Sequence, residues 1–146
     1  MKPRINVITL SVNDLHKSLA FYRDGLGLPT EGIIGAEFEG TATAPAGAVG
    51  FFELNGGLIL ALYPRKELAK DACVVDTSSS SVEFSIGYLV DSKDDVDRLL
   101  RQAEAAGARL TDVAHERPWG IYSGYFMDLD GHLWEVIWNP QMLPGD

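Results

Sequence analysis

The stretch from Gly124 to Pro140 constrains the fold more than any other part of the chain. Its centre, Asp128-Leu-Asp-Gly131, is typical of a tight turn, because aspartate side chains hydrogen-bond to nearby backbone and glycine accepts a positive φ. The flanking segments are rich in aromatic and β-branched residues, which favour strands: Tyr125, Phe126, Trp134, Val136, Ile137 and Trp138. The sequence therefore predicts a β-hairpin with one carboxylate, Glu135, inside its second strand.

Glu135 stands between Trp134 and Val136. A charge in such a place costs free energy unless it is paired, bound to a metal ion or in contact with water. Because side chains alternate across a strand, we expect Glu135 to face one side of the sheet and its two neighbours to pack against helices on the other. Glu135 is therefore the first candidate for a functional residue.

The chain contains two similar halves. In the first, a β-rich segment at Ile5–Val12 precedes an amphipathic helix that is capped at Asn13-Asp14 and ends at Gly25 and Gly27. In the second, Phe84–Val90 precedes a helix that opens with a capping pattern, Ser92-Lys-Asp-Asp95, and ends at Gly107. Strand patterns follow each helix: Ile33–Phe38 (the weakest), Gly47–Leu54 and Leu58–Tyr63 in the first half, and Arg109–His115, Tyr122–Asp128 and Leu133–Trp138 in the second. The predicted class is α+β, with two βαβββ modules at about residues 1–76 and 82–140 of a single domain spanning residues 1–146.

The connecting segments are polar or glycine-rich. Gly35 to Gly50 is rich in Gly, Ala and Thr, and it could be a mobile cover over a cavity or an ordinary surface connection. A short helical turn is predicted at Arg65–Ala72, and the polar run Asp76–Ser81 is predicted to link the modules.

Composition excludes several classes of protein. With 12 Lys and Arg against 21 Asp and Glu, the net charge of −9 argues against nucleic-acid binding, which needs a basic surface. The lone Cys73 excludes an intrachain disulfide and suits a reducing compartment. No segment has the hydrophobic run of a signal peptide or a membrane span, so we expect a cytoplasmic protein that does not enter membranes.

Several short motifs resemble one known superfamily. They are Asn13-Asp14-Leu15, Gly25-Leu-Gly27, Pro118-Trp-Gly120, the closing Tyr125-Phe-Met-Asp-Leu-Asp-Gly-His-Leu-Trp-Glu135, and Trp138-Asn-Pro140. Together they look like the vicinal oxygen chelate superfamily, which contains glyoxalase I, extradiol dioxygenases and bleomycin resistance proteins. This resemblance covers nearly the whole chain. It implies that the two modules form a half-barrel sheet around a concave cavity, and that the protein is a homodimer.

Metal enzymes of that superfamily take their ligands from equivalent strands of both halves. In this chain the corresponding positions fall on Val7, Ala61, Ser85 and Glu135, and only the last is a metal ligand. A catalytic metal ion normally needs three protein ligands. We therefore expect a subgroup that lacks the metal ligands and uses no cofactor, with a two-carboxylate site at Glu83 and Glu135 as the less favoured alternative.

The ligand-binding candidates are polar and aromatic residues on strands or loops that could line the cavity: Thr9, Ser85, Tyr88, His115, Trp119, Tyr122 and Glu135. Trp119 lies in a loop between Pro118 and Gly120, where a large aromatic side chain has less reason to be buried in the core. An aromatic wall with one carboxylate suits a flat organic ligand or a cation. Phe52, Tyr63 and Tyr125 belong to the same set of aromatic residues that could line the cavity. Core packing is the competing interpretation for this set, and we favour it for Phe52.

Two functions remain open. The first is binding of a small, aromatic or cationic organic molecule in a metal-free cavity, in the manner of bleomycin resistance proteins. The second is a lyase or dioxygenase of glyoxalase type, which could work without a metal if Glu135 acts as the general base. Fold resemblance by itself cannot decide between them.

Overall fold

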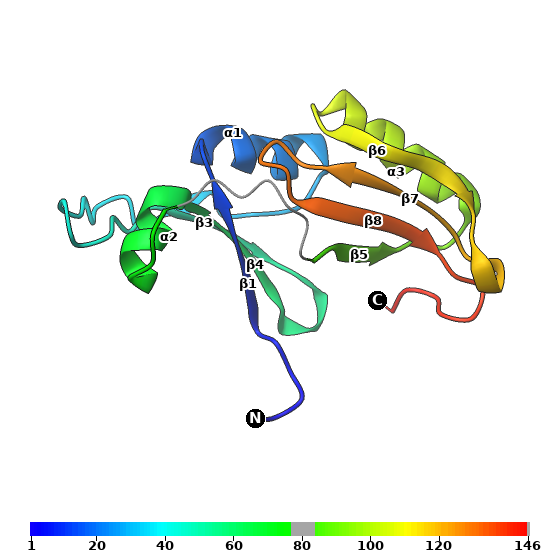
Figure 1. Ribbon diagram of the computed structural model, residues 1–146, viewed down its shortest axis with the longest axis horizontal. Helices are drawn as coiled ribbons and strands as arrows, with labels where there is room; N and C mark the ends of the chain where they lie inside the picture. The colour runs from blue at the N-terminus through cyan, green and yellow to red at the C-terminus, as the bar shows by residue number, and fades with distance from the viewer. Residues whose placement is uncertain (77–83, 146) are drawn as a thin grey trace. The chain divides into compact units, whose positions relative to one another are not determined.

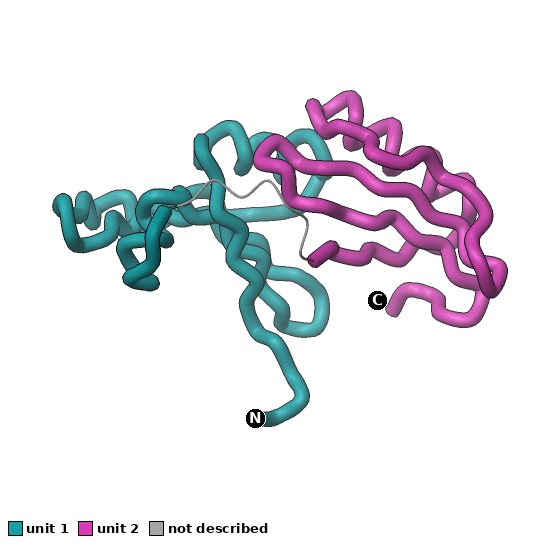
Figure 2. Tube along the Cα trace, viewed as in Figure 1, with its two compact units in different colours: residues 1–79 teal, residues 80–146 magenta. Residues whose placement is uncertain are grey.

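The computed structural model describes residues 1–76 and 84–145, which fall into two compact units within residues 1–79 and 80–146 (Figure 2). Each unit contains a four-stranded mixed sheet, and the described residues also form three α-helices (Figure 1). The predicted α+β class is therefore confirmed. Neither of the described sheets closes into a barrel. Among the described helices, none has the length and apolar character needed to cross a membrane.

The first unit is built around the strand order β1-β4-β3-β2. The strands are β1 (Val7–Val12), β2 (Ile33–Ile34), β3 (Val49–Glu53) and β4 (Ile59–Pro64). Strands β1 and β4 are parallel, and the other neighbours are antiparallel. Helix α1 (Leu15–Ala20) continues into a π-helical turn (Phe21–Gly25), and α2 (Arg65–Ala72) follows β4 directly. The core of this unit includes Leu10, Val12, Leu19, Tyr22, Leu62 and the predicted core residue Phe52.

The second unit repeats this arrangement with the order β5-β8-β7-β6. Its elements are β5 (Ile86–Leu89), α3 (Lys93–Ala105), β6 (Arg109–Glu116), β7 (Tyr122–Met127) and β8 (Leu133–Trp138). Strands β5 and β8 form the parallel pair, as β1 and β4 do in the first unit. The two sheets thus have the same strand order, which is what a repeated βαβββ module requires.

Local signals in the sequence form the structures they predict. The side chain of Asp14 accepts a hydrogen bond from the backbone N–H of Lys17, and the Ser92 hydroxyl accepts one from Asp95, each at 3.1 Å. In the closing hairpin, Asp128 Oδ1 accepts from the backbone N–H groups of Asp130 and His132, at 2.9 and 2.8 Å. Gly131 has φ = 86°, so the turn forms as predicted.

The other predicted strands match the observed ones to within two residues at each end, but two elements differ more. The strand expected at Ile33–Phe38 stops at Ile34, because Gly35 adopts φ = 77° and the Phe38 N–H donates to the Gly35 carbonyl, which turns the chain out of the sheet. The helix expected to end at Gly25 and Gly27 is α-helical only to Ala20 and π-helical over Phe21–Gly25. Most of the linker predicted at Asp76–Ser81 lies outside the described residues.

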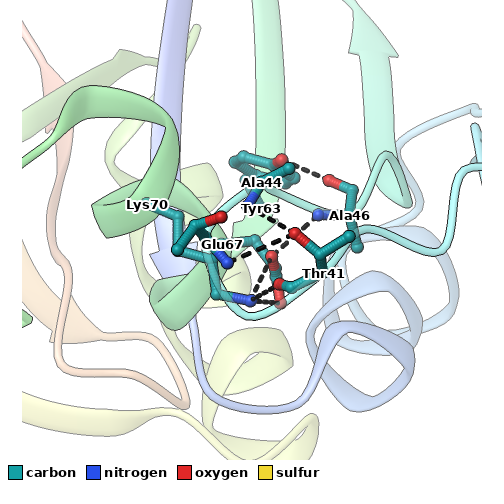
Figure 3. Close-up of polar contacts among 7 residues, drawn as sticks. Thr41, Ala44, Ala46, Tyr63, Glu67 and Lys70 are labelled. Carbon is teal, nitrogen blue, oxygen red and sulfur yellow. Dashed lines mark hydrogen bonds and ion pairs between the residues drawn. The ribbon is translucent and has the colours of Figure 1, made fainter.

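The glycine-rich segment between β2 and β3 is a folded loop held against α2 and β4 (Figure 3). Glu67 of α2 accepts a hydrogen bond from the backbone N–H of Ala46 at 2.8 Å, and Lys70 donates to the carbonyl of Thr41 at 3.0 Å. Tyr63 of β4 donates to the Ala46 carbonyl. These contacts all join the loop to elements of its own unit.

Helix α3 covers one face of the second sheet (Figure 1). Phe126, Trp134 and Val136 are buried, with the Phe126 and Trp134 rings stacked at a centroid distance of 6.0 Å. Gly124 of β7 permits the close approach of the helix, because a Cβ atom there would lie 2.6 Å from Leu100 Cδ1. The opposite face of the sheet carries the polar residues described next.

Candidate ligand-binding face of the second sheet

Glu135 lies on the face of β8 that α3 does not cover. Its neighbours Trp134 and Val136 are 8% and 0% exposed, whereas Glu135 is half-buried. The strand therefore keeps its apolar side chains in the core and its carboxylate outside it, as the alternation of the sequence predicts. This arrangement avoids the cost of an unpaired charge in the core.

The hairpin register brings two residues of β7 to Glu135. Tyr125 is the cross-strand partner of Glu135, and its hydroxyl donates a hydrogen bond to the carboxylate. Ser123, two residues earlier on β7, donates from Oγ to Glu135 Oε2 at 2.7 Å. Burial raises the pKa of the Tyr125 hydroxyl, and the neighbouring Glu135 carboxylate raises it further.

Arg117 lies over the same part of β7. Its Nε donates to Ser123 Oγ at 2.5 Å, and its Nη2 donates to the Ser123 carbonyl at 3.2 Å and to Asp112 Oδ2 at 2.9 Å. The guanidinium carbon lies 5.3 Å from the centre of the Tyr125 ring. Only 22% of the Arg117 side chain is exposed, so its position is defined by these contacts.

Irregular pairing between β6 and β7 brings Asp112 and His115 together. The register shifts between Leu110 and Asp112 and again between Asp112 and His115. As a result, two residues three positions apart share one side of the sheet, and His115 Nε2 lies 3.0 Å from Asp112 Oδ2.

These contacts shift two pKa values in opposite directions. Hydrogen bonds from Arg117, and then from His115, lower the pKa of the Asp112 carboxyl. A hydrogen bond with the Glu116 carbonyl, and then one with Asp112, raises the pKa of the His115 imidazole. Both changes favour a charged pair at the outer end of the hydrogen-bonded chain.

We call these six side chains the Glu135 cluster: Asp112, His115, Arg117, Ser123, Tyr125 and Glu135. A continuous series of hydrogen bonds runs from His115 through Asp112, Arg117 and Ser123 to Glu135. The cluster offers a carboxylate, a guanidinium and an aromatic ring next to one another. Such a combination can recognise a small polar ligand that also has a flat apolar part.

The structure brings only some of the predicted ligand-binding residues together. Glu135 and His115 belong to the cluster. Ser85 is exposed and directly precedes β5, in which Gly87 is the partner of Glu135. Thr9 is exposed on β1 in the first unit.

Two of the three predicted aromatic residues, Tyr122 and Tyr88, lie on the other face of the sheet from the Glu135 cluster. Tyr122 donates from its hydroxyl to Asp97 of α3 at 2.9 Å, so it lies on the helix-covered face. Tyr88 pairs with Val136 and shares that face. Trp119 is 83% exposed in the turn Pro118–Gly120, with φ = 63°, a conformation that is uncommon for a residue with a side chain.

Sequence reasoning missed Asp112, Arg117 and Ser123, and it considered Tyr125 only as one of several aromatic residues that could line the cavity. A signal for two of them was present. Residues at equal distances from the predicted turn at Asp128–Gly131 face each other across a hairpin, which pairs Tyr125 with Glu135 and puts Ser123 on the same face. Asp112 and Arg117 gave no such signal, because their positions depend on the irregular pairing of β6.

The donor set does not fit the metal ion that the superfamily resemblance implies. The side chains of Val7 and Ala61 have no atoms that could coordinate a cation, and the Glu135 carboxylate already accepts hydrogen bonds from Ser123 and Tyr125. Over residues 1–76 and 84–145, no three His, Cys, Asp or Glu side chains are grouped as a metal site would require. Glu83, the alternative partner of Glu135, lies outside the described residues.

Comparisons with known proteins agree on one superfamily. The model of the glyoxalase/bleomycin resistance protein/dioxygenase superfamily matches residues 4–136. A metallothiol transferase, FosB, of Lysinibacillus sphaericus is 30% identical over 133 residues, which cover 90% of this chain and 79% of that protein.

Solved structures show the same fold. The crystal structure of a glyoxalase-related enzyme from Fulvimarina pelagi has a TM-score of 0.77 and 30% identity, and the match covers 94% of this chain and 89% of that one. The fosfomycin resistance protein FosX from Listeria monocytogenes has a TM-score of 0.67 at 22% identity, with 95% of each chain covered, and shows similarity of fold alone. The fold predicted from the sequence motifs is thus confirmed.

Proposed function

Because the chain belongs to the glyoxalase/bleomycin resistance protein/dioxygenase superfamily, we propose that it binds a small aromatic or cationic organic molecule, and that it does so without a metal ion. One observation carries this proposal: Ser123 and Tyr125 hold the Glu135 carboxylate on the sheet face that α3 leaves uncovered. A carboxylate fixed in this way can pair with a ligand cation. The Tyr125 ring beside it can support an aromatic group.

The metal-free part of the proposal rests on the donor set. The superfamily's ligand positions in β1 and β4 are occupied by Val7 and Ala61. Elemental analysis of protein purified without chelator should find less than stoichiometric Ni, Zn, Fe and Mn. One bound equivalent of any of these metals would overturn this part of the proposal.

A second function, a lyase or dioxygenase of glyoxalase type, is supported by the pairing of Tyr125 with Glu135. A carboxylate and a phenol that lie next to each other on one sheet face can act as general base and general acid on neighbouring atoms of one substrate. In this alternative Glu135 accepts a proton from the substrate without the help of a metal. Its distinguishing property is turnover of a carbonyl compound, which simple binding does not produce.

A thermal-shift series separates the two functions. A ligand that binds only the native state raises the melting temperature, so 2-phenylethylamine should raise it more than acetophenone, a neutral carbonyl compound of similar size. Glu135→Gln should abolish the shift caused by 2-phenylethylamine, because it removes the negative charge and preserves the shape. The matched control is Glu53→Gln, at the exposed end of β3. An unchanged shift in Glu135→Gln would remove the carboxylate from the proposed site.

We also propose a homodimer located in the cytoplasm, as expected from the sequence. Light scattering coupled to gel filtration should give twice the 15.9 kDa mass of one chain. A monomeric mass at micromolar concentration would overturn the dimer. Fractionation of the source cells would test the location.

A further inference from the structure

Arg117 has hydrogen-bonding capacity that the described part of the protein does not use. Its Nε and Nη2 atoms bind Ser123 and Asp112, whereas Nη1 has no hydrogen-bond partner among the described residues. A guanidinium group can donate five hydrogen bonds in a fixed planar arrangement. Since the side chain is only 22% exposed, the free Nη1 end is a donor held in place beside the Tyr125 ring.

A single hydroxyl group separates the guanidinium of Arg117 from the Glu135 carboxylate. Arg117 and Glu135 both contact the hydroxyl of Ser123, Arg117 as donor to it and Glu135 as acceptor from it. No direct ion pair joins Arg117 to Glu135 in the described structure, because the Ser123 hydroxyl lies between them and the carboxylate that pairs with Arg117 is that of Asp112, at 2.9 Å. The cluster therefore presents a positive and a negative group side by side on one face.

A ligand with a single charge fits this pair poorly. A cation bound at Glu135 would lie close to the positive guanidinium, and an anion bound at Arg117 would lie close to the negative carboxylate. The other carboxylate of the cluster, Asp112, is shared between Arg117 and His115 at 2.9 and 3.0 Å, so it is already engaged. A ligand that carries both charges on neighbouring atoms would satisfy both groups.

We propose that the Glu135 cluster recognises an aromatic amino-carboxylate, whose carboxylate binds Arg117 Nη1, whose ammonium group binds Glu135 and whose ring lies against Tyr125. This inference rests on the proposed function, because it assumes that the ligand binds at Glu135. It narrows the ligand class from any aromatic or cationic molecule to a zwitterion of the amino-acid type.

Three probes that share a phenylethyl group test the charge requirement by isothermal titration calorimetry. They are L-phenylalanine, which has both charges, 2-phenylethylamine, which lacks the carboxylate, and 3-phenylpropionate, which lacks the ammonium group. We expect L-phenylalanine to bind at least about tenfold more tightly than either of the others, since each charge it adds gains a partner.

Two variants assign the two charges to their partners. In Arg117→Gln, L-phenylalanine should bind no better than 2-phenylethylamine, and in Glu135→Gln no better than 3-phenylpropionate. Arg101→Gln, an exposed arginine of α3, is the matched control and should keep the wild-type order. If Arg117→Gln does not fold, the ratios among the three probes in the wild-type protein still decide the proposal.

The outcomes distinguish this inference from the proposed function. Equal binding of 2-phenylethylamine and L-phenylalanine, with both lost in Glu135→Gln, would overturn the zwitterion and leave the proposed function standing. Tightest binding by 3-phenylpropionate would overturn the zwitterion and the role of Glu135 as a cation partner. No saturable binding by any of the three probes would overturn both.

Discussion

Ser123 Oγ donates a hydrogen bond to Glu135 Oε2 at 2.7 Å while it accepts one from Arg117 Nε. A single buried hydroxyl therefore links a carboxylate on β8 to a guanidinium that follows β6. Ser123 is 0% exposed, so water does not replace either bond in the folded protein. The orientation of both charged groups depends on this residue.

Ser123→Ala should destabilise the protein. It leaves Arg117 Nε without its acceptor and Glu135 without one donor, and losing a partner of a buried polar group costs about 1–3 kcal/mol. The free energy of unfolding, measured by urea denaturation, should fall by that amount. Ser85→Ala, which alters an exposed serine, should change it by less than about 0.5 kcal/mol. Equal effects of the two substitutions would contradict the role of Ser123.

Gly124→Ala should be destabilising because β7 has no space for a methyl group at this position. A Cβ atom would lie 2.6 Å from Leu100 Cδ1 of α3 and 2.9 Å from the backbone nitrogen of Ala114. Overpacking of this kind costs about 1–3 kcal/mol, which thermal melts would detect. Gly145→Ala, where a Cβ atom meets nothing within 4 Å, is the control and should melt with the wild type.

His115 should titrate at a lower pH in Asp112→Asn than in the wild-type protein. Its raised pKa has two causes, the Glu116 carbonyl first and the Asp112 carboxylate second, and the substitution removes only the second. Two-dimensional NMR of the imidazole resonances would show the shift. An unchanged titration of His115 in Asp112→Asn would contradict the role of Asp112 in raising this pKa.

The raised pKa of His115 also sets the sign of its contribution to stability. A group whose pKa is higher in the folded state stabilises the protein below its unfolded pKa and loses that effect as the pH rises through the folded value. Stabilisation by the His115–Asp112 pair should therefore be present from the acid range in which Asp112 is still ionised up to pH 6.5, and it should weaken as the pH rises further. If the wild-type protein gained stability relative to Asp112→Asn as the pH rose from 6 to 8, this assignment would be contradicted.

Glu67→Gln should loosen the loop between β2 and β3. The Glu67 carboxylate accepts a hydrogen bond from the Ala46 N–H and forms an ion pair with Lys70 (Figure 3). Lys70 in turn donates a hydrogen bond to the Thr41 carbonyl. Hydrogen exchange measured by mass spectrometry should become faster in residues 41–46. The same substitution at the exposed Glu53 should leave that exchange unchanged.

Acid should have a similar effect on the loop. The backbone N–H of Ala46, and to a smaller degree Lys70, lowers the pKa of the Glu67 carboxyl. A group with a lowered pKa stabilises the folded state above its unfolded value and loses that effect as the pH falls through the folded value. The loop should therefore loosen as the pH falls below 4.5. Hydrogen exchange measured above pH 5 should instead show residues 41–46 protected.

The hairpin at the end of the chain shows how much of the fold could be predicted. Asp128 and Gly131 specify the turn through local hydrogen bonding and a positive φ, and these need no partner elsewhere in the chain. The cap at Ser92 is local in the same sense. By contrast, the predicted strand at Ile33–Phe38 was too long, because its end depends on a turn at Gly35 that β-propensity does not reveal.

Tyr122 and Arg117 show why the candidate site was harder to predict. Both lie close to the turn that joins β6 to β7, and an aromatic residue near a strand end gave the stronger signal in the sequence. In the structure Tyr122 binds Asp97 of α3, while Arg117 lies over Tyr125 on the other face. Which of the two faces a residue joins depends on the register, and a shift of one residue reverses it.

The sequence by itself determined that Glu135 would lie on the sheet face opposite to Trp134 and Val136, because alternation of side chains along a strand is a property of the backbone. The tertiary structure alone decided which groups surround this carboxylate. Irregular pairing of β6 with β7 puts Asp112 and His115, three residues apart, in contact with each other, and Arg117 meets Ser123 across the same two strands. These contacts depend on long-range pairing, so local propensity in the sequence does not specify them.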